Sequence, residues 1–255
     1  MTKFIGIDNG LMMPPVQGLS DESTIQHYKL GTRLVLDERV YHYAKCVTTE
    51  LVRGRGCITT STPEESAVAG ATTTKDVGAD TVTITVQAAA GLALDALAGG
   101  YLCYKFHRHK ILSHPAADNA ATCVLTLETP IVEDTITSGV TTVTAVPSLW
   151  KVTKATNAAG YAHFMGFPPS NVPANSYFWC QSWGPVLACP ANYMGSTQSV
   201  RDCVFCTDGS ITDNDAIGTI GHPRAGTLIL DSYTVNTAGT NFDDTSHLLN
   251  VQLWA

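Results

Sequence analysis

The sequence predicts an all-β protein, and three observations carry that prediction. Only 15% of the 255 residues are charged and 44% are apolar, against a usual charged share of about 25%. Residues 81–86 alternate threonine with valine or isoleucine, which places the apolar side chains on one face of a strand. Turn signals between residues 71 and 146 recur about every 8–12 residues, the spacing of a small sandwich or barrel.

The chain is expected to have three parts. Residues 1–26 show no lasting periodicity and predict an extended N-terminal arm, punctuated by Gly10, Pro14, Pro15 and Gly18. Residues 27–66 and 147–255 are expected to form one discontinuous β-barrel or sandwich domain. Residues 67–146, a block of strand and turn patterns, are expected to form a small inserted β domain.

The first strands of the larger domain are expected in a hairpin. Residues 32–36 lead into an Asp37-Glu38 turn, and residues 39–46 return with alternation. In the returning strand Val40, His42 and Ala44 share one face and Tyr41, Tyr43 and Lys45 share the other, so both faces should be partly covered.

Further strands are predicted along the rest of the chain, at residues 100–106, 110–114, 122–127, 141–146, 176–183, 200–206, 216–221, 228–233 and 248–254. The last of these alternates up to the end of the sequence and should lie within a sheet. His222-Pro223-Arg224 is expected to be a turn. The best helix candidate is 63–69, with Thr62 as its N-cap and Pro63 as its first residue.

Charge and hydropathy argue against two classes of partner. A net charge of −7 and a pI near 5.5 disfavour nucleic acid, which needs clustered lysine and arginine. The short basic clusters, Arg53 with Arg55 and residues 105–110, are expected to be solvated hairpin faces. No apolar run reaches the roughly 18 residues of a membrane span, and no signal peptide is visible at residues 1–8.

The eight cysteines are expected to be free thiols, mostly buried, because several lie in strand-like segments where cysteine acts as a small apolar residue. Cys203 and Cys206 have the spacing of a zinc or redox pair. No second pair of ligands matches them, and residues three apart on a strand face opposite ways. Cysteine chemistry is therefore not predicted at this pair.

Other motif-like segments have structural explanations. Residues 5–10 resemble the first phosphate loop of sugar kinases, but a proline-rich arm follows in place of the α/β domain that such a loop needs. His107 and His109 share a strand face near His114, which permits a weak metal site, although a surface hairpin is the preferred interpretation. Asp208, Gly209 and residues 213–215 lack the spacing of a calcium loop. The prediction is therefore no catalytic residue, no metal ligand, no cofactor and no enzyme activity.

Three stretches resemble one family of virion proteins. They are residues 31–44; residues 98–102 with 110–116 and 125–131; and residues 177–185 with 217–221 and 251–253. In them the chain is similar to the head decoration, or cement, proteins of tailed bacteriophages. It departs from that family in its many cysteines and in the histidines at 107–109, where a glycine-rich turn is usual.

The resemblance implies a β-rich structural protein that binds the major capsid protein on the outer capsid surface, as a homotrimer at local symmetry axes. Such a protein is assembled in the host cytoplasm and located in the virion. It stabilises the shell through added interface, about 1,500–2,000 Å² per contact. The arm at 1–26 would reach over neighbouring subunits.

Two alternatives stay open at this stage. The chain could be another virion component, such as a head fibre or tail protein. It could instead be a carbohydrate-binding β module, since alternation places Tyr177, Trp179, Gln181 and Trp183 on one strand face where aromatic rings could stack on sugars. The competing interpretation of that face is that it forms core.

Overall fold

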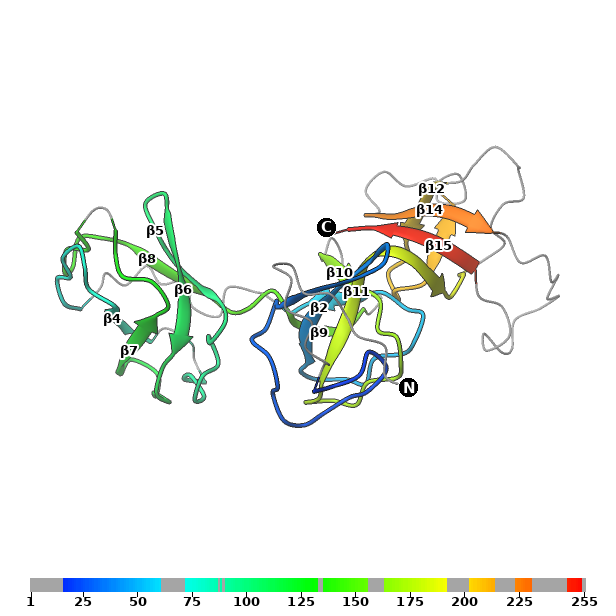
Figure 1. Ribbon diagram of the computed structural model, residues 1–255. Coiled ribbons are helices and arrows are strands. Elements are labelled where there is room, and N and C mark those ends of the chain that lie inside the picture. Colours follow the sequence, from blue (N-terminus) through cyan, green and yellow to red (C-terminus); the bar gives the residue numbers. More distant parts are fainter. Residues whose placement is uncertain are drawn as a thin grey trace. The chain divides into compact units, whose positions relative to one another are not determined.

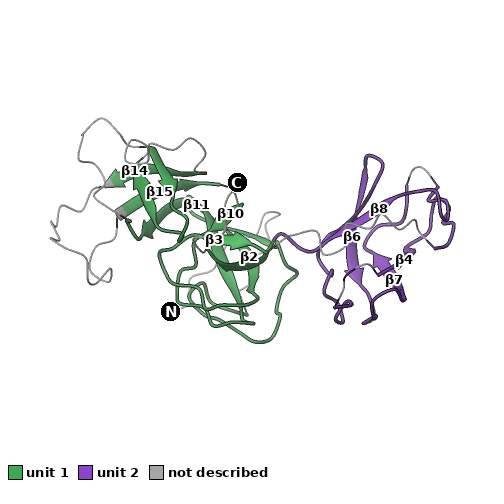
Figure 2. Cartoon of the chain, turned by 180° about the vertical axis from the view of Figure 1, so that it is seen from behind, with its two compact units in different colours: residues 1–60, 150–255 green, residues 61–149 purple. Residues whose placement is uncertain are grey.

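The computed structural model describes residues 16–60, 72–86, 88, 90–132, 135–155, 163–191, 202–213, 223–230 and 247–253. Within these ranges the chain is all-β and without helices, which confirms the predicted class. It separates into two compact units, residues 1–60 with 150–255 and residues 61–149 (Figures 1 and 2). The boundaries expected at 66/67 and 146/147 thus move to 60/61 and 149/150. The helix candidate at 63–69 lies outside the described residues.

The first unit begins with the predicted hairpin. Strand β1 (Arg33–Leu36) pairs antiparallel with β2 (Arg39–Cys46) around a turn in which Asp37 has a φ of 53°. Aspartate tolerates this left-handed conformation better than most residues. Both faces of β2 are covered, since Tyr41 and Tyr43 are as buried as Ala44 on the opposite face.

Strand β2 belongs to a ring of five strands, which we call the first barrel. It pairs antiparallel with β11 (Tyr177–Ala188) and parallel with β9 (Lys151–Lys154). Strand β3 (Cys57–Thr59) follows β9, and β10 (Phe164–Gly166) follows β3. Two backbone hydrogen bonds of 2.8 and 2.9 Å between Phe167 and Gln181 then join the end of β10 to β11. The series therefore returns on itself.

Gly166 makes this closure possible. Its φ is 154°, and a Cβ atom there would lie 2.2 Å from the carbonyl oxygen of Gln181 and 2.8 Å from Cys180 Sγ. A backbone oxygen in a paired strand cannot move aside cheaply. A residue with a side chain would push β10 away from β11, so glycine is required at the seam.

The second half of β11 starts another curled sheet in the same unit. It pairs with β15 (His247–Gln252), which pairs with β14 (Arg224–Leu230), followed by β12 (Asp202–Phe205) and β13 (Ile211–Asp213). The C-terminal strand does lie inside a sheet, as predicted. Arg224 was expected in a turn but is the first residue of β14, because it pairs with Val204 of β12. The strand predicted at 216–221 lies outside the described residues.

Apolar packing joins the first barrel to this second sheet. The rings of Phe164 and Phe205 stack with centroids 3.9 Å apart and planes 2° from parallel. A Cβ atom at Gly56 would come within 2.4 Å of Phe205 and 2.8 Å of Phe164. The stack therefore occupies the space that a side chain at position 56 would need.

The second unit is one curled antiparallel sheet. Its strand order is β4 (Thr81–Thr85), β7 (Thr122–Leu127), β6 (His107–Ser113), β5 (Tyr101–Tyr104) and β8 (Val143–Val146). The alternation predicted for 81–86 is confirmed, because Val82 and Ile84 are fully buried between half-exposed threonines. Alternate residues of all five strands fill one core, which turns and loops such as those carrying Leu97 and Ile136 complete.

Candidate functional site

An aromatic wall lies on the outside of the first barrel. It consists of Tyr41, Tyr43, Tyr177 and Trp179, which are alternate residues of β2 and β11. Tyr28 packs on it, with its ring 5.2 Å from that of Tyr43 and 5.1 Å from that of Trp179. The chain thus covers its own aromatic surface with the segment that precedes β1.

Gln17 fixes this covering segment from within. Tyr43 Oη donates to Gln17 Oε1 at 2.6 Å, and Gln17 Nε2 donates to the carbonyl oxygens of Asp21 and Tyr177, both at 2.8 Å. Trp179 Nε1 donates to the carbonyl oxygen of Gln17 at 3.2 Å. Gln17 is 4% exposed, so these partners replace water for both ends of its amide. The sequence did not single out Gln17, which lies in the part assigned to an arm.

The arm expected at 1–26 is therefore attached over residues 16–26. Ser23 pairs with Tyr177 through hydrogen bonds of 3.0 and 2.7 Å, which adds a backbone link to those of Gln17. Residues 1–15 lie outside the described residues.

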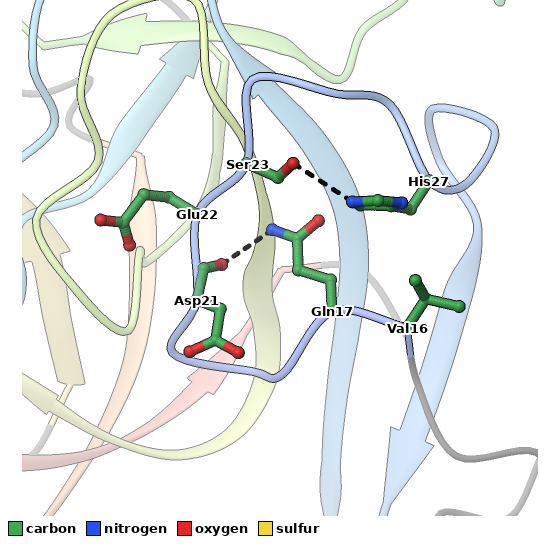
Figure 3. A pocket seen from close by; sticks show the side chains of 6 residues that line it. All are labelled: Val16, Gln17, Asp21, Glu22, Ser23 and His27. Carbon is green, nitrogen blue, oxygen red and sulfur yellow. Dashed lines mark hydrogen bonds between the residues drawn. The ribbon is translucent and has the colours of Figure 1, made fainter.

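The covering segment forms an open hollow of about 420 Å³ on its outer side (Figure 3). Its lining is Val16, Gln17, Asp21, Glu22, Ser23 and His27. Ser23 Oγ lies 3.2 Å from His27 Nε2, a distance at which serine and histidine can exchange a proton. The same hydroxyl accepts the Ile25 N–H at 3.0 Å, and Asp21 Oδ2 accepts the Gly18 N–H at 3.1 Å. These polar groups therefore hold the turns of the segment.

The face proposed for sugar stacking is not an open platform. Trp179 is 2% exposed beneath Tyr28, and Gln181 is 5% exposed. Gln181 Nε2 donates to the carbonyl oxygens of Trp183 and Pro185 at 3.2 and 2.7 Å. Tyr177 and Trp183 are half-buried. The core interpretation of this face is the one that the structure supports.

The histidines of the second unit are more buried than a surface hairpin would allow. His109 is 3% exposed and stacks against Tyr104, whose hydroxyl lies 3.4 Å from its Nε2. His107 lies beside the same tyrosine, with ring centroids 5.4 Å apart. The structure therefore brings His107 and His109 to one inward face. Phe106, at the tip of the hairpin, is fully exposed.

His114 is held in one tautomer by the backbone. Its Nε2 accepts the Leu97 N–H at 2.9 Å, so the proton is on Nδ1, which donates to the carbonyl oxygen of Pro115 at 2.7 Å. This histidine therefore links two loops through hydrogen bonds to their backbones.

The cysteine motif and the aspartate motif near the second sheet do not form one common site. Cys203 is buried in β12, whereas Cys206 follows the strand and is half-buried. Burial raises the pKa of the Cys206 thiol, and the Asp208 charge adds to this, so the reactive thiolate is disfavoured. Asp208 binds Arg55 at 2.8 Å and Ser210 through its other oxygen. Among the described residues, no three His, Cys, Asp or Glu side chains are placed to hold a metal ion.

His42 is a buried titratable group inside the first barrel. Its Nδ1 lies 3.0 Å from Ser182 Oγ, and its ring stacks on Trp150 with centroids 4.2 Å apart. Burial, with a smaller contribution from the Arg33 charge, lowers the pKa of His42 to about 4. The imidazole is therefore neutral near pH 7, and it links β2 to β11 as a hydrogen-bonding group.

The outer face of the five-stranded sheet is an exposed surface with a distinct composition. Threonine dominates it: Thr81, Thr83, Thr85, Thr122, Thr126 and Thr144. Two apolar side chains, Leu112 and Val124, are 49% and 43% exposed there. Arg108 and Lys110 supply its positive charge, with Arg108 lying 5.9 Å from the Tyr101 ring and Lys110 Nζ 3.9 Å from Glu128. We call this the threonine face.

These surfaces are the candidates that the structure offers for function: an open polar hollow on one unit and the threonine face on the other. Within the described residues, no helix is long and apolar enough to cross a membrane. No family model, curated protein or solved structure matches the chain in the three comparisons with known proteins.

Proposed function

We propose that the chain is a structural virion protein, a head decoration protein that binds the outer surface of a phage capsid and stabilises the shell. The observation that carries the proposal is the threonine face. It is a sheet surface on which six threonines outnumber the charged Arg108 and Lys110, and on which Leu112 and Val124 are exposed beside these short polar side chains. A surface of this kind suits docking more than solvation, because interface cores are depleted in charged residues.

The remainder of the second unit supports a docking role. Its core lies entirely on the other side of the sheet, so the threonine face can be buried by a partner without rearranging the unit. The threonines are β-branched and keep few rotamers, so little side-chain entropy is lost on binding. The major capsid protein is the partner we propose for this face, with self-association into a homotrimer.

The sequence resemblance to cement proteins points the same way, over stretches that fall on β1 and β2, on parts of β5, β6 and β7, and on parts of β11 and β15. Strands β5, β6 and β7 belong to the sheet that carries the threonine face, whereas the others are scaffold, where the resemblance concerns the fold. A head fibre or tail component would share the β-rich scaffold. It would differ in assembly, forming a fibre or a ring in place of a decorated shell.

The experiment mixes the purified chain with shells built from the major capsid protein of the same virus and measures co-sedimentation. A double variant, Leu112→Glu with Val124→Glu, places two charges on the threonine face. Its matched control is Leu187→Glu, a residue that is 58% exposed on the other unit. We expect binding by the parent and the control, and a loss of at least tenfold in affinity for the double variant. Equal binding by all three would overturn the assignment of this face.

A further inference from the structure

Two thiols far apart in the sequence meet inside the first barrel. Cys57 on β3 and Cys180 on β11 are separated by 123 residues, and their sulfur atoms are 3.6 Å apart. Their exposed fractions are 1% and 0%. Cys180 is paired with His42 in the register of β2 and β11, so it shares the inward face of the barrel with the His42–Ser182 contact.

The backbone at the closing seam brings the two sulfurs together. Cys57 Sγ lies 3.4 Å from the carbonyl oxygen of Gly166, to which it donates. A Cβ atom at position 166 would lie 2.8 Å from Cys180 Sγ, so the bare glycine leaves room for that sulfur. Strand β10, which carries Gly166, pairs with β3 and meets β11 at the seam. A bond between the thiols would therefore tie β3 to β11 across β10, the strand that closes the ring at the seam.

We propose that Cys57 and Cys180 are an oxidation site, at which a peroxide converts the two thiols into a disulfide that locks the first barrel. One thiolate sulfur attacks the peroxide O–O bond and becomes a sulfenic acid, releasing one water. The sulfur of the second cysteine then displaces the hydroxyl group, an S–S bond forms, and a second water leaves. Two thiols and one hydrogen peroxide thus give one disulfide and two waters. The sulfurs close from 3.6 Å to about 2.0 Å.

The buried position of the two thiols makes the reaction slow. Burial raises the pKa of the Cys180 thiol well above its ordinary value, an effect to which the neighbouring Cys57 adds, so the thiolate is scarce. The lock therefore stays open in a reducing compartment and forms during long exposure to oxidant. Cys46, another thiol on the inward face, donates to the carbonyl oxygen of Thr49 at 3.1 Å, and burial, with a smaller contribution from the nearby Cys57, raises its pKa to about 11. It serves as the internal control.

The position of the pair along the chain gives the lock a specific consequence. The whole second unit, residues 61–149, lies between Cys57 and Cys180. A cut anywhere in that unit would divide a reduced chain into two fragments. The oxidised chain would stay one covalent molecule, because the disulfide joins the segments on either side of the insertion.

The test uses the full chain with a specific protease site inserted after Lys105, at the exposed tip of the β5–β6 hairpin. The protein is held in hydrogen peroxide, its remaining thiols are blocked, and it is cleaved and separated without reductant. We expect one band of full mass that splits into two on reduction, and a Cys57–Cys180 linked peptide by mass spectrometry that lacks two hydrogens. The Cys46→Ala control should keep the band, and Cys57→Ala and Cys180→Ala should each lose it.

Two results would overturn the proposal. The first is two fragments without reductant from a parent protein whose circular dichroism spectrum shows the native fold. The second is a linked peptide that joins a different pair of cysteines. Because peptide mapping is done on the parent sequence, a variant that fails to fold does not decide the outcome.

Discussion

The two units use β-strands in opposite ways. In the first unit β2 and the first half of β11 are covered on both sides, by the barrel interior on one face and by the segment 16–30 on the other. In the second unit every strand has one buried face and one facing solvent. The first arrangement makes a scaffold whose surfaces are used internally. The second leaves a regular surface free, and it is there that we place the docking function.

The largest effect that distinguishes the units is expected at Gly166. Gly166→Ala forces a Cβ atom against the Gln181 carbonyl oxygen and opens the seam of the first barrel. We expect a loss of about 3–5 kcal/mol in the free energy of unfolding, measured by denaturant titration. The matched control is Gly139→Ala in the second unit, which also has positive φ but meets nothing within 4 Å. It should lose only about 1 kcal/mol from backbone strain. Equal losses would contradict the role of the seam.

The second prediction compares the two faces of one strand, β7. Leu125→Ala removes a fully buried side chain from the core of the second unit and should cost about 2–5 kcal/mol. Val124→Ala, its neighbour on the threonine face, should change stability by less than about 0.5 kcal/mol. Thermal unfolding of both variants measures the difference. A similar cost for the two would mean that the threonine face is already covered within the chain.

The third prediction concerns acid sensitivity, which His42 should give to the first unit. Its pKa of about 4 in the folded chain is below the ordinary 6.5, so the unfolded chain binds the proton first as pH falls. Stability is then fully present above pH 6.5 and is lost between 6.5 and 4, by up to about 3 kcal/mol. His42→Gln should flatten this part of the pH profile. An unchanged slope in the variant would assign the acid sensitivity to other groups.

A smaller effect is expected at Gln17, which attaches the covering segment. Gln17→Ala leaves the buried Tyr43 hydroxyl and the Tyr177 carbonyl without their amide partners. We expect a loss of about 1–3 kcal/mol and faster amide hydrogen exchange in residues 16–28. Exchange that stays at the parent rate would show that the aromatic contacts of Tyr28 hold the segment alone.

The smallest effect is expected at the ion pair between Arg55 and Asp208. Burial raises the pKa of Asp208, but hydrogen bonds from Ser210 and the Arg55 charge outweigh it and hold the pKa below its ordinary 3.8. The carboxylate thus stabilises the fold above that pH and loses the effect as pH falls through its folded pKa. Since the pair is partly exposed, Asp208→Asn should cost less than about 1 kcal/mol at pH 7.

Strand patterns carried most of what the sequence could predict. Alternation in the sequence predicted β4 and the two faces of β2. In a strand with one buried face, every second residue is apolar, so the sequence itself shows which side chains are buried. The short strands β3, β9, β10 and β13 were missed. The three residues of β3, β10 and β13 hold too little alternation to be distinguished from a loop, and distant partners determine the pairing of all four strands. The ring that β10 closes could not have been seen from local pattern.

The candidate sites were harder to predict than the fold. Trp179 and Tyr177 share a strand face as predicted, but alternation cannot show that a segment 150 residues earlier covers Trp179. Likewise Cys57 and Cys180 lie on β3 and β11, which do not pair in the sheet and come together only inside the closed ring. The spacing of Cys203 and Cys206 drew attention because it is local. Proximity between distant residues depends on topology, which the sequence pattern leaves open.

The central claim is that the second unit docks through its threonine face onto a capsid shell. Electron microscopy of shells incubated with the purified chain tests it most directly, together with the mass of the free protein in solution. We expect a trimer in solution and density at local symmetry axes of the shell, with the outer faces of β6 and β7 against the capsid surface. Bare shells, or a fibre or ring formed by the chain alone, would contradict the claim.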